Sequence, residues 1–391
     1  MPSLAEFIDD RRARVEFEAI KLDKPIALVD LPTPALVIDL DVFETNLDRM
    51  QSFLSGHGLG LRCHTKMHKC PVIAHQQISR GAIGVCAAKV SEAEIMQAAG
   101  VRDILITSPV STQDKIERLV RLASSNDSLK IVVDCIETAT AMDSTAATAG
   151  CTVGIFIDLD PGMGRTGIAP LEPALALGRH IRDSCPALKF EGLQMYAGDC
   201  MHISDYEKRK AKYARLMEKG RQTRDMFEAD GIPVPVFSGG GTGSYDMESE
   251  LGILTEVQAG SYAFMDIEYR DIASRTGPHF DDFAPSLFVL VSAISKPQDR
   301  LITVDAGFKC LASDKSAPQF REVEGVVYHW GGDEHGIVQL NNPSRQIALG
   351  DKLEVITPHC DPTVNLHDFF FPYRNGMVEE IWPISARGCS Q

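Results

Sequence analysis

Short, almost wholly apolar runs alternate with helical stretches through the central part of the chain. We count eight such runs, at residues 60–64, 83–88, 103–108, 129–134, 153–160, 190–196, 234–238 and 256–262. Several are apolar at nearly every position, as expected for strands that are buried on both faces of a parallel sheet. The alternation predicts an α/β protein in which eight βα units close into a (β/α)8 barrel of the TIM type. An open doubly wound sheet would produce the same alternation, so the pattern leaves both architectures open.

The pattern changes on either side of these units. Residues 1–25 are polar, which predicts an N-terminal helical segment before a barrel at 26–276. From about residue 277, strands follow one another without long helices, for example at 286–292, 301–305, 352–357 and 378–382. The sequence therefore predicts a separate C-terminal β domain at 277–391.

Composition narrows the class of partner. The chain has 391 residues, of which 44% are hydrophobic and 24% charged, and its formal net charge is -15. Nucleic acids and anionic membranes need a concentrated basic face, so we expect a small-molecule partner, no nucleic acid and no membrane. No apolar stretch approaches the length of a membrane span, and the N-terminus lacks the order of a secretory signal. The ten cysteines form no CxxC pair, which favours buried thiols in a cytoplasmic protein.

In a barrel, catalytic residues follow the carboxyl ends of the strands. Lys66 lies just past the first apolar run, in the segment RCHTKMHK at 62–69. A lysine there could have its pKa lowered and form an imine, although basic strand ends are also typical of solvated loops. Arg165 lies in the glycine-rich turn after the fifth run, where a tight loop with a surface arginine is the alternative interpretation.

Two further strand ends predict a phosphate site. The seventh run leads into SGGGTGS at 238–244, and the eighth ends in GSY at 260–262. Successive glycines let backbone N–H groups approach an anion closely, and barrel enzymes often hold phosphate after strands seven and eight. We therefore predict one phosphate site built by both loops, with a flexible turn as the alternative. Its residues are Gly241, Thr242, Gly243, Gly260, Ser261 and Tyr262.

A possible metal site lies in the β domain. If the segment His359-Cys360-Asp361 is extended, His359 and Asp361 point to one side and Cys360 to the other. Imidazole and carboxylate suit a divalent cation, and two ligands alone would leave the site open for water or substrate. A polar turn before a strand is an equally good interpretation of this spacing.

Taken together, these motifs resemble those of the D-threonine aldolase and D-serine dehydratase family of fold-type III pyridoxal-phosphate (PLP) enzymes, which is related to alanine racemase. The resemblance spans nearly the whole chain. The matching segments are TPALVID at 33–39, HTKMHK at 64–69, KVSEAE at 89–94, GGGTGS at 239–244, GSYAFMD at 260–266, DAG at 305–307, DEHG at 333–336 and SARG at 385–388. It implies an alanine racemase-like, PLP-binding barrel and a C-terminal β domain that carries metal ligands.

The resemblance also implies roles in binding the cofactor. Lys66 matches the lysine that holds PLP as a Schiff base, whereas Lys69 does not. Arg165 matches the arginine at the phenolic oxygen of PLP, and Tyr196 lies where an aromatic residue meets the ring. The two glycine-containing segments match the phosphate grip.

The metal ligands distinguish activities within this family. His359 and Asp361 match its divalent-metal ligands, and His202 matches a histidine proposed to act near the metal. In this family the metal ligands of eukaryotic-type D-serine dehydratases look like a His-x-Cys pair with zinc, whereas those of D-threonine aldolases look like a His-x-Asp pair. Asp361 therefore favours cleavage of 3-hydroxy-D-amino acids, such as D-threonine and D-phenylserine, to glycine and an aldehyde. We expect Mn2+ as the metal, with Mg2+, Co2+ or Zn2+ as alternatives, and a homodimer.

Three alternative functions stay open. The chain could be a β-hydroxyaspartate aldolase, which joins glyoxylate and glycine, or a dehydratase of D-serine or 3-hydroxyaspartate, with Lys66 as the base. A non-catalytic PLP carrier is the alternative outside catalysis. Because such carriers lack the β domain, the segment at 277–391 counts against this hypothesis.

Overall fold

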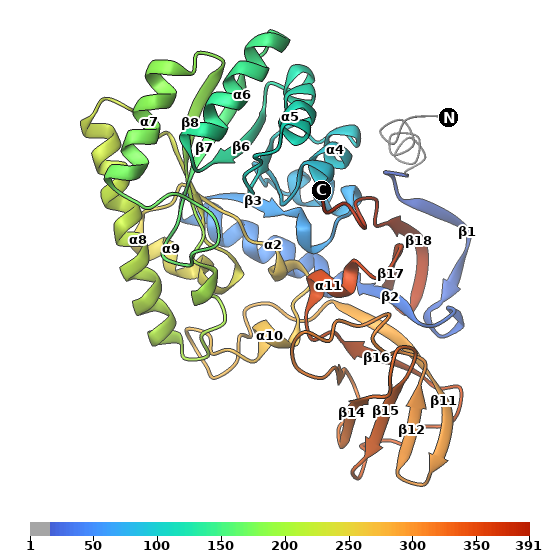
Figure 1. Ribbon diagram of the computed structural model, residues 1–391. Coiled ribbons are helices and arrows are strands. Elements are labelled where there is room, and N and C mark those ends of the chain that lie inside the picture. Colours follow the sequence, from blue (N-terminus) through green and yellow to red (C-terminus); the bar gives the residue numbers. More distant parts are fainter. Residues whose placement is uncertain (1–15) are drawn as a thin grey trace. The chain divides into compact units, whose positions relative to one another are not determined.

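The structure is a computed structural model that describes residues 16–391 (Figure 1). It divides into two compact units. The barrel unit comprises Arg49–Lys66, Ala74–Gly260 and Cys389–Gln391, and the sheet unit comprises Met67–Ile73, Ser261–Gly388 and the described residues up to Asp48. Residues 1–15, which hold most of the expected N-terminal helix, lie outside the described part. The end of that segment belongs to strand β1 (Ile20–Ala27), in which Pro25 disfavours a helix.

Eight parallel strands close the barrel unit, which confirms the barrel and excludes the open sheet. Their order around the barrel is β10-β3-β4-β5-β6-β7-β8-β9. The strands are β3 (Gly60–His64), β4 (Gly84–Ala87), β5 (Ile104–Ile106), β6 (Leu129–Val133), β7 (Val153–Leu159), β8 (Leu188–Met195), β9 (Val236–Gly239) and β10 (Glu256–Val257). Strands β4, β5 and β7 are buried at every position, because the barrel interior covers one face and helices cover the other.

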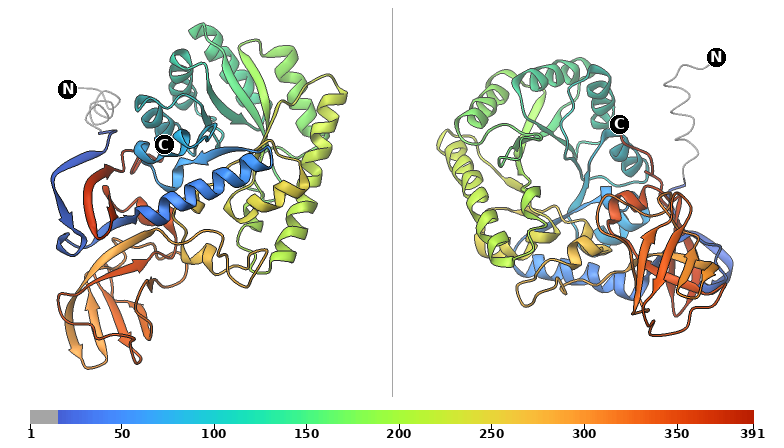
Figure 2. Two further views of the ribbon diagram at one scale, coloured as in Figure 1. Left: turned by 180° about the vertical axis from the view of Figure 1, so that it is seen from behind. Right: turned by 60° about the horizontal axis from the view of Figure 1, so that its bottom comes forward.

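Helices surround these strands, as the right-hand view of Figure 2 shows. Those wholly within the barrel unit are α4 (Val90–Ala98), α5 (Gln113–Ser125), α6 (Ile136–Ala149), α7 (Glu172–Ser184), α8 (Tyr206–Ala229) and α9 (Tyr245–Leu251). Helices α2 (Leu40–Gly56) and α3 (Pro71–Ser79) run across the boundaries between the units. Within residues 16–391, no helix combines the length and apolar character needed to cross a membrane. None of the ten cysteines, all of which the structure describes, forms a disulfide.

The eighth predicted strand is shorter than its apolar run. Strand β10 covers only Glu256–Val257, and residues Ser261–Ala263 form the 3-10 turn η5. Irregular pairing continues for two residues, since the Gln258 amide donates to the Gly239 carbonyl and the His64 amide donates to the Ala259 carbonyl. The chain then leaves the barrel, so the expected run to residue 262 was too long.

The sheet unit contains ten strands. Eight of them follow the order β1-β18-β17-β2-β11-β12-β15-β14, while β16 pairs with β11 and β13. Besides β1, the strands are β2 (Ala35–Asp39), β11 (Leu287–Gln298), β12 (Leu301–Val304), β13 (Gln319–Phe320), β14 (Val326–Trp330), β15 (Gly336–Leu340), β16 (Lys352–Ile356), β17 (Phe369–Arg374) and β18 (Met377–Pro383). The short helices α10 (Ile267–Arg270) and α11 (Cys360–Val364) belong to the same unit.

Strand β2 departs from the predicted organisation. It falls in the segment 26–276 that we assigned to the barrel, but it pairs with β11 and β17 of the sheet unit. Its residues Leu36, Val37 and Ile38 are fully buried. An apolar run shows that a strand will be buried, but it does not specify its partner strands, and here both partners lie more than 200 residues away.

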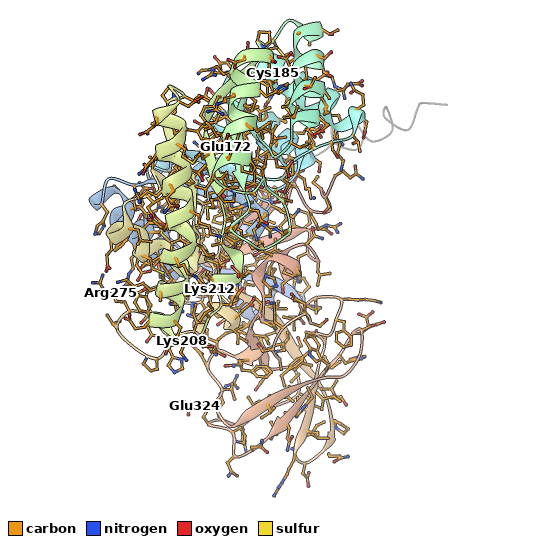
Figure 3. The ribbon with its side chains drawn as sticks, turned by 60° about the vertical axis from the view of Figure 1, so that its left-hand side comes forward. Glu172, Cys185, Lys208, Lys212, Arg275 and Glu324 are labelled. Carbon is orange, nitrogen blue, oxygen red and sulfur yellow. The ribbon has the colours of Figure 1, made fainter. Side chains whose placement is uncertain are left out.

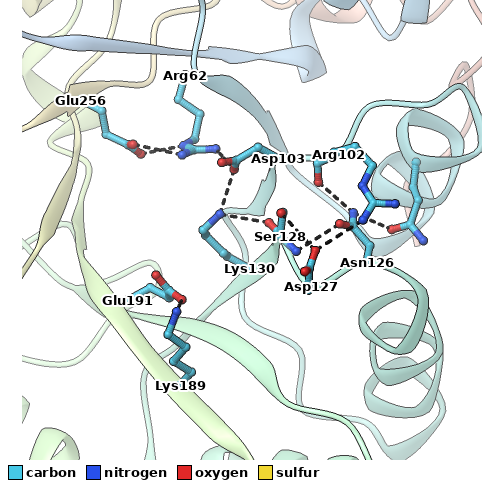
Figure 4. Close-up of polar contacts among 11 residues, drawn as sticks. Arg62, Arg102, Asp103, Asn126, Asp127, Ser128, Lys130, Lys189, Glu191 and Glu256 are labelled. Atoms are coloured by element: carbon cyan, nitrogen blue, oxygen red, sulfur yellow. Dashed lines mark hydrogen bonds and ion pairs between the residues drawn. The ribbon is translucent and has the colours of Figure 1, made fainter.

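A buried ion network lies near the amino-terminal ends of the barrel strands (Figure 4). Arg62 on β3 donates through Nε and Nη2 to Glu256 on β10, at 2.7 and 3.1 Å. The two side chains are only 4% and 3% exposed. Arg62 also pairs with Asp103, which accepts a hydrogen bond from Lys130 Nζ at 2.9 Å. This end of a barrel typically serves stability, and the network fits that role.

Replacing Arg62 with methionine should lower the free energy of unfolding by about 3–5 kcal/mol, because Glu256 would stay buried without its counter-charge. Arg102→Met is the matched control. Its pair with Asp127 has side chains 65% and 91% exposed, so the loss should stay within about 1 kcal/mol. Urea unfolding measures both. Similar losses in the two variants would mean that the buried network contributes no more than a surface pair.

Candidate functional site

The predicted site residues of the barrel unit follow five consecutive strands around the barrel. They are Lys66 after β3, Gly260 after β10, the segment Gly241, Thr242 and Gly243 after β9, Tyr196 and His202 after β8, and Arg165 after β7. Because all strands are parallel, these residues lie at the same, carboxyl-terminal end of the barrel. Strands β4, β5 and β6 contribute none of the predicted residues.

Lys66 lies in the 3-10 turn η2 (Thr65–Met67), directly after β3. The turn is anchored by the Thr65 hydroxyl, which donates to the Cys86 carbonyl at 2.8 Å. Lys66 is exposed, whereas Lys69 is 7% exposed. The more accessible of the two lysines is therefore the one expected to bind the cofactor.

Arg165, Tyr196 and the glycine loop (residues 238–244) form one contiguous group. The guanidinium carbon of Arg165 lies 5.5 Å from the centroid of the Tyr196 ring. A Cβ atom on Gly241 would lie 3.6 Å from the same ring. Gly198 also borders it, and a Cβ there would come within 2.5 Å of Tyr196 Cε1, so only glycine leaves room for the ring. These residues suit the ring and phosphate of PLP, which need an aromatic neighbour, a cation and bare backbone.

Three carboxylates hold the loop that carries Arg165. Asp160 accepts hydrogen bonds from the backbone amides of residues 162–164. Asp158 accepts one from the Thr166 hydroxyl at 3.0 Å. Asp134 accepts one from the amide of Gly167 at 3.1 Å. The loop is therefore held by hydrogen bonds on both sides of Arg165.

Asp158 is part of a buried polar network that the sequence interpretation missed. Gln194 Nε2 donates to Asp158 Oδ1 at 2.9 Å and to the Thr107 carbonyl at 3.3 Å. Gln258 Nε2 donates in turn to Gln194 Oε1 at 3.0 Å and to the Ser238 hydroxyl at 2.8 Å. The Thr107 carbonyl can only accept a hydrogen bond, so the NH2 group of Gln194, and not its oxygen, has to face it. The same NH2 group therefore faces Asp158. Isolated polar residues in otherwise apolar runs were the available signal.

Burial raises the pKa of Asp158 to about 6, against the lowering effect of its bonds to Gln194 and Thr166. Because the pKa is raised, protonated Asp158 stabilises the folded state. This contribution to the free energy of unfolding, about 3 kcal/mol, is complete below pH ~4 and is lost as pH rises through ~6. Asp158→Asn should lack this titration. The free energy of unfolding of the wild type, relative to that of the variant, should thus fall by up to about 3 kcal/mol from pH ~4 to pH ~7. A constant difference in urea unfolding would contradict the shifted pKa.

The second half of the predicted phosphate site lies in the sheet unit. Ser261 and Tyr262 form the turn η5 with Ala263. Tyr262 is fully buried, and its ring meets Phe283 edge to face at a centroid distance of 5.8 Å. A phosphate site shared between this turn and the glycine loop therefore stays a prediction.

The predicted metal pair, His359 and Asp361, lies at the start of a helix. Cys360–Val364 forms α11, so the extended geometry considered for this segment does not occur, and only His359, the residue before the helix, is extended. His359 Nε2 and Asp361 Oδ2 are nevertheless 3.9 Å apart. Cys360 is fully buried, with its thiol donating to the Met265 carbonyl at 3.5 Å. Burial also raises the pKa of this thiol well above its ordinary value.

Asp314 is a supporting residue that spacing alone did not reveal. Its Oδ2 lies 2.8 Å from His359 Nδ1, so Nε2 is the ring nitrogen that faces Asp361. Metal-binding histidines commonly donate their other N–H to a carboxylate in this way. Two atoms that bind one divalent ion at about 2.1 Å lie roughly 3–4 Å apart, so His359 and Asp361 fit an open site. Among the residues that the structure describes, no group of three or more His, Cys, Asp and Glu is arranged to hold a metal.

The chain is similar to known proteins over most of its length. The family model described as "Alanine racemase, N-terminal domain" matches residues 38–268, and a serine dehydratase domain model matches residues 286–372. A 3-hydroxy-D-aspartate aldolase of Paracoccus denitrificans (strain Pd 1222) is 38% identical over 362 residues, which cover 92% of this chain and 93% of that protein. A D-threonine aldolase of Arthrobacter sp. is 38% identical over 367 residues, covering 94% and 95%. The crystal structure of D-threonine aldolase from Filomicrobium marinum matches with a TM-score of 0.90 and 37% identity, covering 96% of this chain and 100% of that one.

Proposed function

This chain belongs to the alanine racemase N-terminal domain family, in the group that includes D-threonine aldolases and 3-hydroxy-D-aspartate aldolases, and from this we propose that it cleaves 3-hydroxy-D-amino acids to glycine and an aldehyde. It is a lyase that acts on a small amino acid, with PLP as its cofactor. D-Threonine and D-phenylserine are the proposed substrates, and a divalent cation, Mn2+ first, is the proposed second cofactor.

The geometry around Cys360 carries the choice of an aldolase over a dehydratase. Its thiol is buried and bonded to a carbonyl, while Asp361 approaches His359 to 3.9 Å. The chain thus offers the His-x-Asp pair typical of the aldolases, with the intervening thiol directed to a backbone carbonyl. This observation supports the distinction that the resemblance suggested.

Each proposed residue has a task in this reaction. Lys66 would hold the cofactor covalently, and Arg165 and the glycine loop would bind its phenolic oxygen and phosphate. When bound, PLP acts as an electron sink for negative charge at the substrate α-carbon. His359 and Asp361 would hold the cation, which lowers the pKa of a hydroxyl group. His202 would accept the proton of the substrate hydroxyl as the carbon–carbon bond breaks.

A 3-hydroxy-D-aspartate substrate is the second candidate, because the 3-hydroxy-D-aspartate aldolase is as similar to this chain as the D-threonine aldolase is. It would require a cation for the second carboxylate of the substrate. We further propose a cytoplasmic homodimer. Multi-angle light scattering of the purified protein tests the dimer, and a monomer mass would refute it.

The test of function is one assay series on the protein after chelation, with and without added Mn2+. Glycine and the matching aldehyde are measured from D-threonine and D-phenylserine, glyoxylate from 3-hydroxy-D-aspartate, and ammonia from D-serine. We expect metal-dependent glycine without ammonia. Ammonia and pyruvate from D-serine would identify a dehydratase. Glycine and glyoxylate from 3-hydroxy-D-aspartate, with no cleavage of D-threonine or D-phenylserine, would identify the second candidate. Bound PLP without any turnover would identify a carrier.

A further inference from the structure

Arg209 is buried beneath two loops that carry proposed site residues. It lies in the first turn of α8 and is 0% exposed, although its neighbour Lys208 is exposed at the same end of the helix (Figure 3). Burying an ionised guanidinium is costly unless its N–H groups are satisfied. Its position in the fold therefore needs an explanation from its contacts.

Arg209 joins the two loops through their backbone. Its Nε donates to the carbonyl of Gly243, in the glycine loop, at 3.0 Å. Its Nη1 donates to the carbonyl of Ile203, which directly follows His202, at 2.6 Å. Because the guanidinium donors are coplanar and rigidly spaced, one side chain sets the separation of the two carbonyls.

The two loops are also in direct contact. A Cβ on Gly243 would come within 2.6 Å of the Met201 carbonyl oxygen, so the backbones are packed without space for a side chain. Tyr206, whose ring centroid lies 5.4 Å from the Arg209 guanidinium carbon, donates its hydroxyl to Asp246 at 2.8 Å. Asp246 lies in α9, which continues from the glycine loop. A displacement of one loop therefore has to be transmitted to the other.

Helix α8 holds the other end of the His202 loop as well. Lys212 lies one turn after Lys208 on α8 (Figure 3). It pairs with the carboxylate of Asp199. Asp199 belongs to the 3-10 turn η3 (Gly198–Cys200), at the start of the segment that ends at Ile203. The segment 198–203, which contains His202, is thus fastened to α8 at both ends.

We propose that Arg209 is a positioning residue that couples the phosphate site to His202. An anion bound by the glycine loop holds Gly243, and through Arg209 it holds the backbone next to His202. This rests on the proposed function, in which the glycine loop takes the cofactor phosphate and His202 takes a proton. An occupied phosphate site would thus add to the restraint on the backbone that orients His202 for proton transfer.

Hydrogen exchange of the full-length protein tests the coupling directly. Arg209→Met is compared with Arg215→Met, which removes an exposed arginine from the same helix. In the wild type and R215M, added PLP should slow exchange in both 198–204 and 240–244, whereas in R209M it should slow exchange in 240–244 only. Protection of both segments in R209M would overturn the coupling. If PLP protects neither segment in the wild type, the proposed phosphate site itself fails.

Kinetics provide a second test, at saturating PLP and Mn2+. R209M should lower kcat about tenfold, the equivalent of one charge-assisted hydrogen bond, with little change in KM. Arg209→Lys, whose ammonium reaches only one carbonyl, should lie between wild type and R209M, and it replaces R209M if that variant does not fold. R209M combined with His202→Ala should lose no more activity than H202A alone, because Arg209 acts through His202. Additive losses would assign Arg209 a purely structural role.

Discussion

Lys66→Ala will remove the visible absorbance band of the lysine-bound cofactor and will lower kcat by about three orders of magnitude or more. Lys66 is the exposed lysine directly after β3, and no other group of the proposed site can form the same covalent link. The variant should keep its fold and its noncovalent affinity for PLP, since Arg165 and the glycine loop are unchanged. Absorbance spectra during PLP titration measure the band and the affinity, circular dichroism measures the fold, and the assay of glycine and aldehyde measures kcat.

The control for this variant is Lys89→Ala, which removes an exposed lysine after the neighbouring strand β4. It should retain the absorbance band. Borohydride reduction of the wild type, followed by peptide mapping, should mark Lys66 alone. A band that persists in K66A, or a mark on Lys69, would assign the covalent link to another lysine.

Asp361→Ala will remove most of the metal-dependent turnover while the PLP content stays at the wild-type level. Because only two protein ligands are proposed, the loss of one should lower activity by about a hundredfold or more, exceeding the usual cost of losing a supporting residue. Activity across a Mn2+ titration and the absorbance of bound PLP measure the two effects. Equal losses of activity and of PLP would instead indicate a structural role for Asp361.

Asp314→Ala is the graded comparison. It keeps both proposed ligands but removes the carboxylate that lies 2.8 Å from His359 Nδ1. We expect a loss of about tenfold that excess Mn2+ restores, since the histidine would be less well oriented but still present. If D314A loses as much as D361A and metal does not restore it, Asp314 would itself be a ligand.

The strands of the barrel could be predicted from the sequence because each one is a short, continuous apolar run. Runs such as Val153–Leu159 are buried on both faces, so nearly every side chain is apolar and the run is visible without knowledge of its neighbours. Glycines and a lysine at strand ends were equally visible. The closure of the barrel could not be predicted, because an open sheet has the same alternation of strands and helices. The short length of β10 could not be predicted either, because it depends on pairing with β3 and β9.

The supporting parts of the site depend on distant residues. Asp158 and Gln258 are joined by Gln194 across the barrel, and Asp314 meets His359 from 45 residues away. Asp158 and Gln194 interrupt apolar runs in the sequence, but nothing in those runs identifies their hydrogen-bond partners. The resemblance covered the residues expected to touch the cofactor and metal, but it did not extend to those that orient them.

The sequence by itself determined the number of barrel strands, because each is a short apolar run. It also led to the predictions for the lysine after the first strand, the glycine loop and the His-x-Asp pair, because each lies in a short motif. Only the tertiary structure decided that the barrel closes, that β2 joins the sheet unit and that Cys360 faces a buried carbonyl. It also decided that Arg209 ties two loops together. The reason is that pairing, burial and hydrogen bonds between distant residues depend on three-dimensional neighbours, which no local pattern specifies.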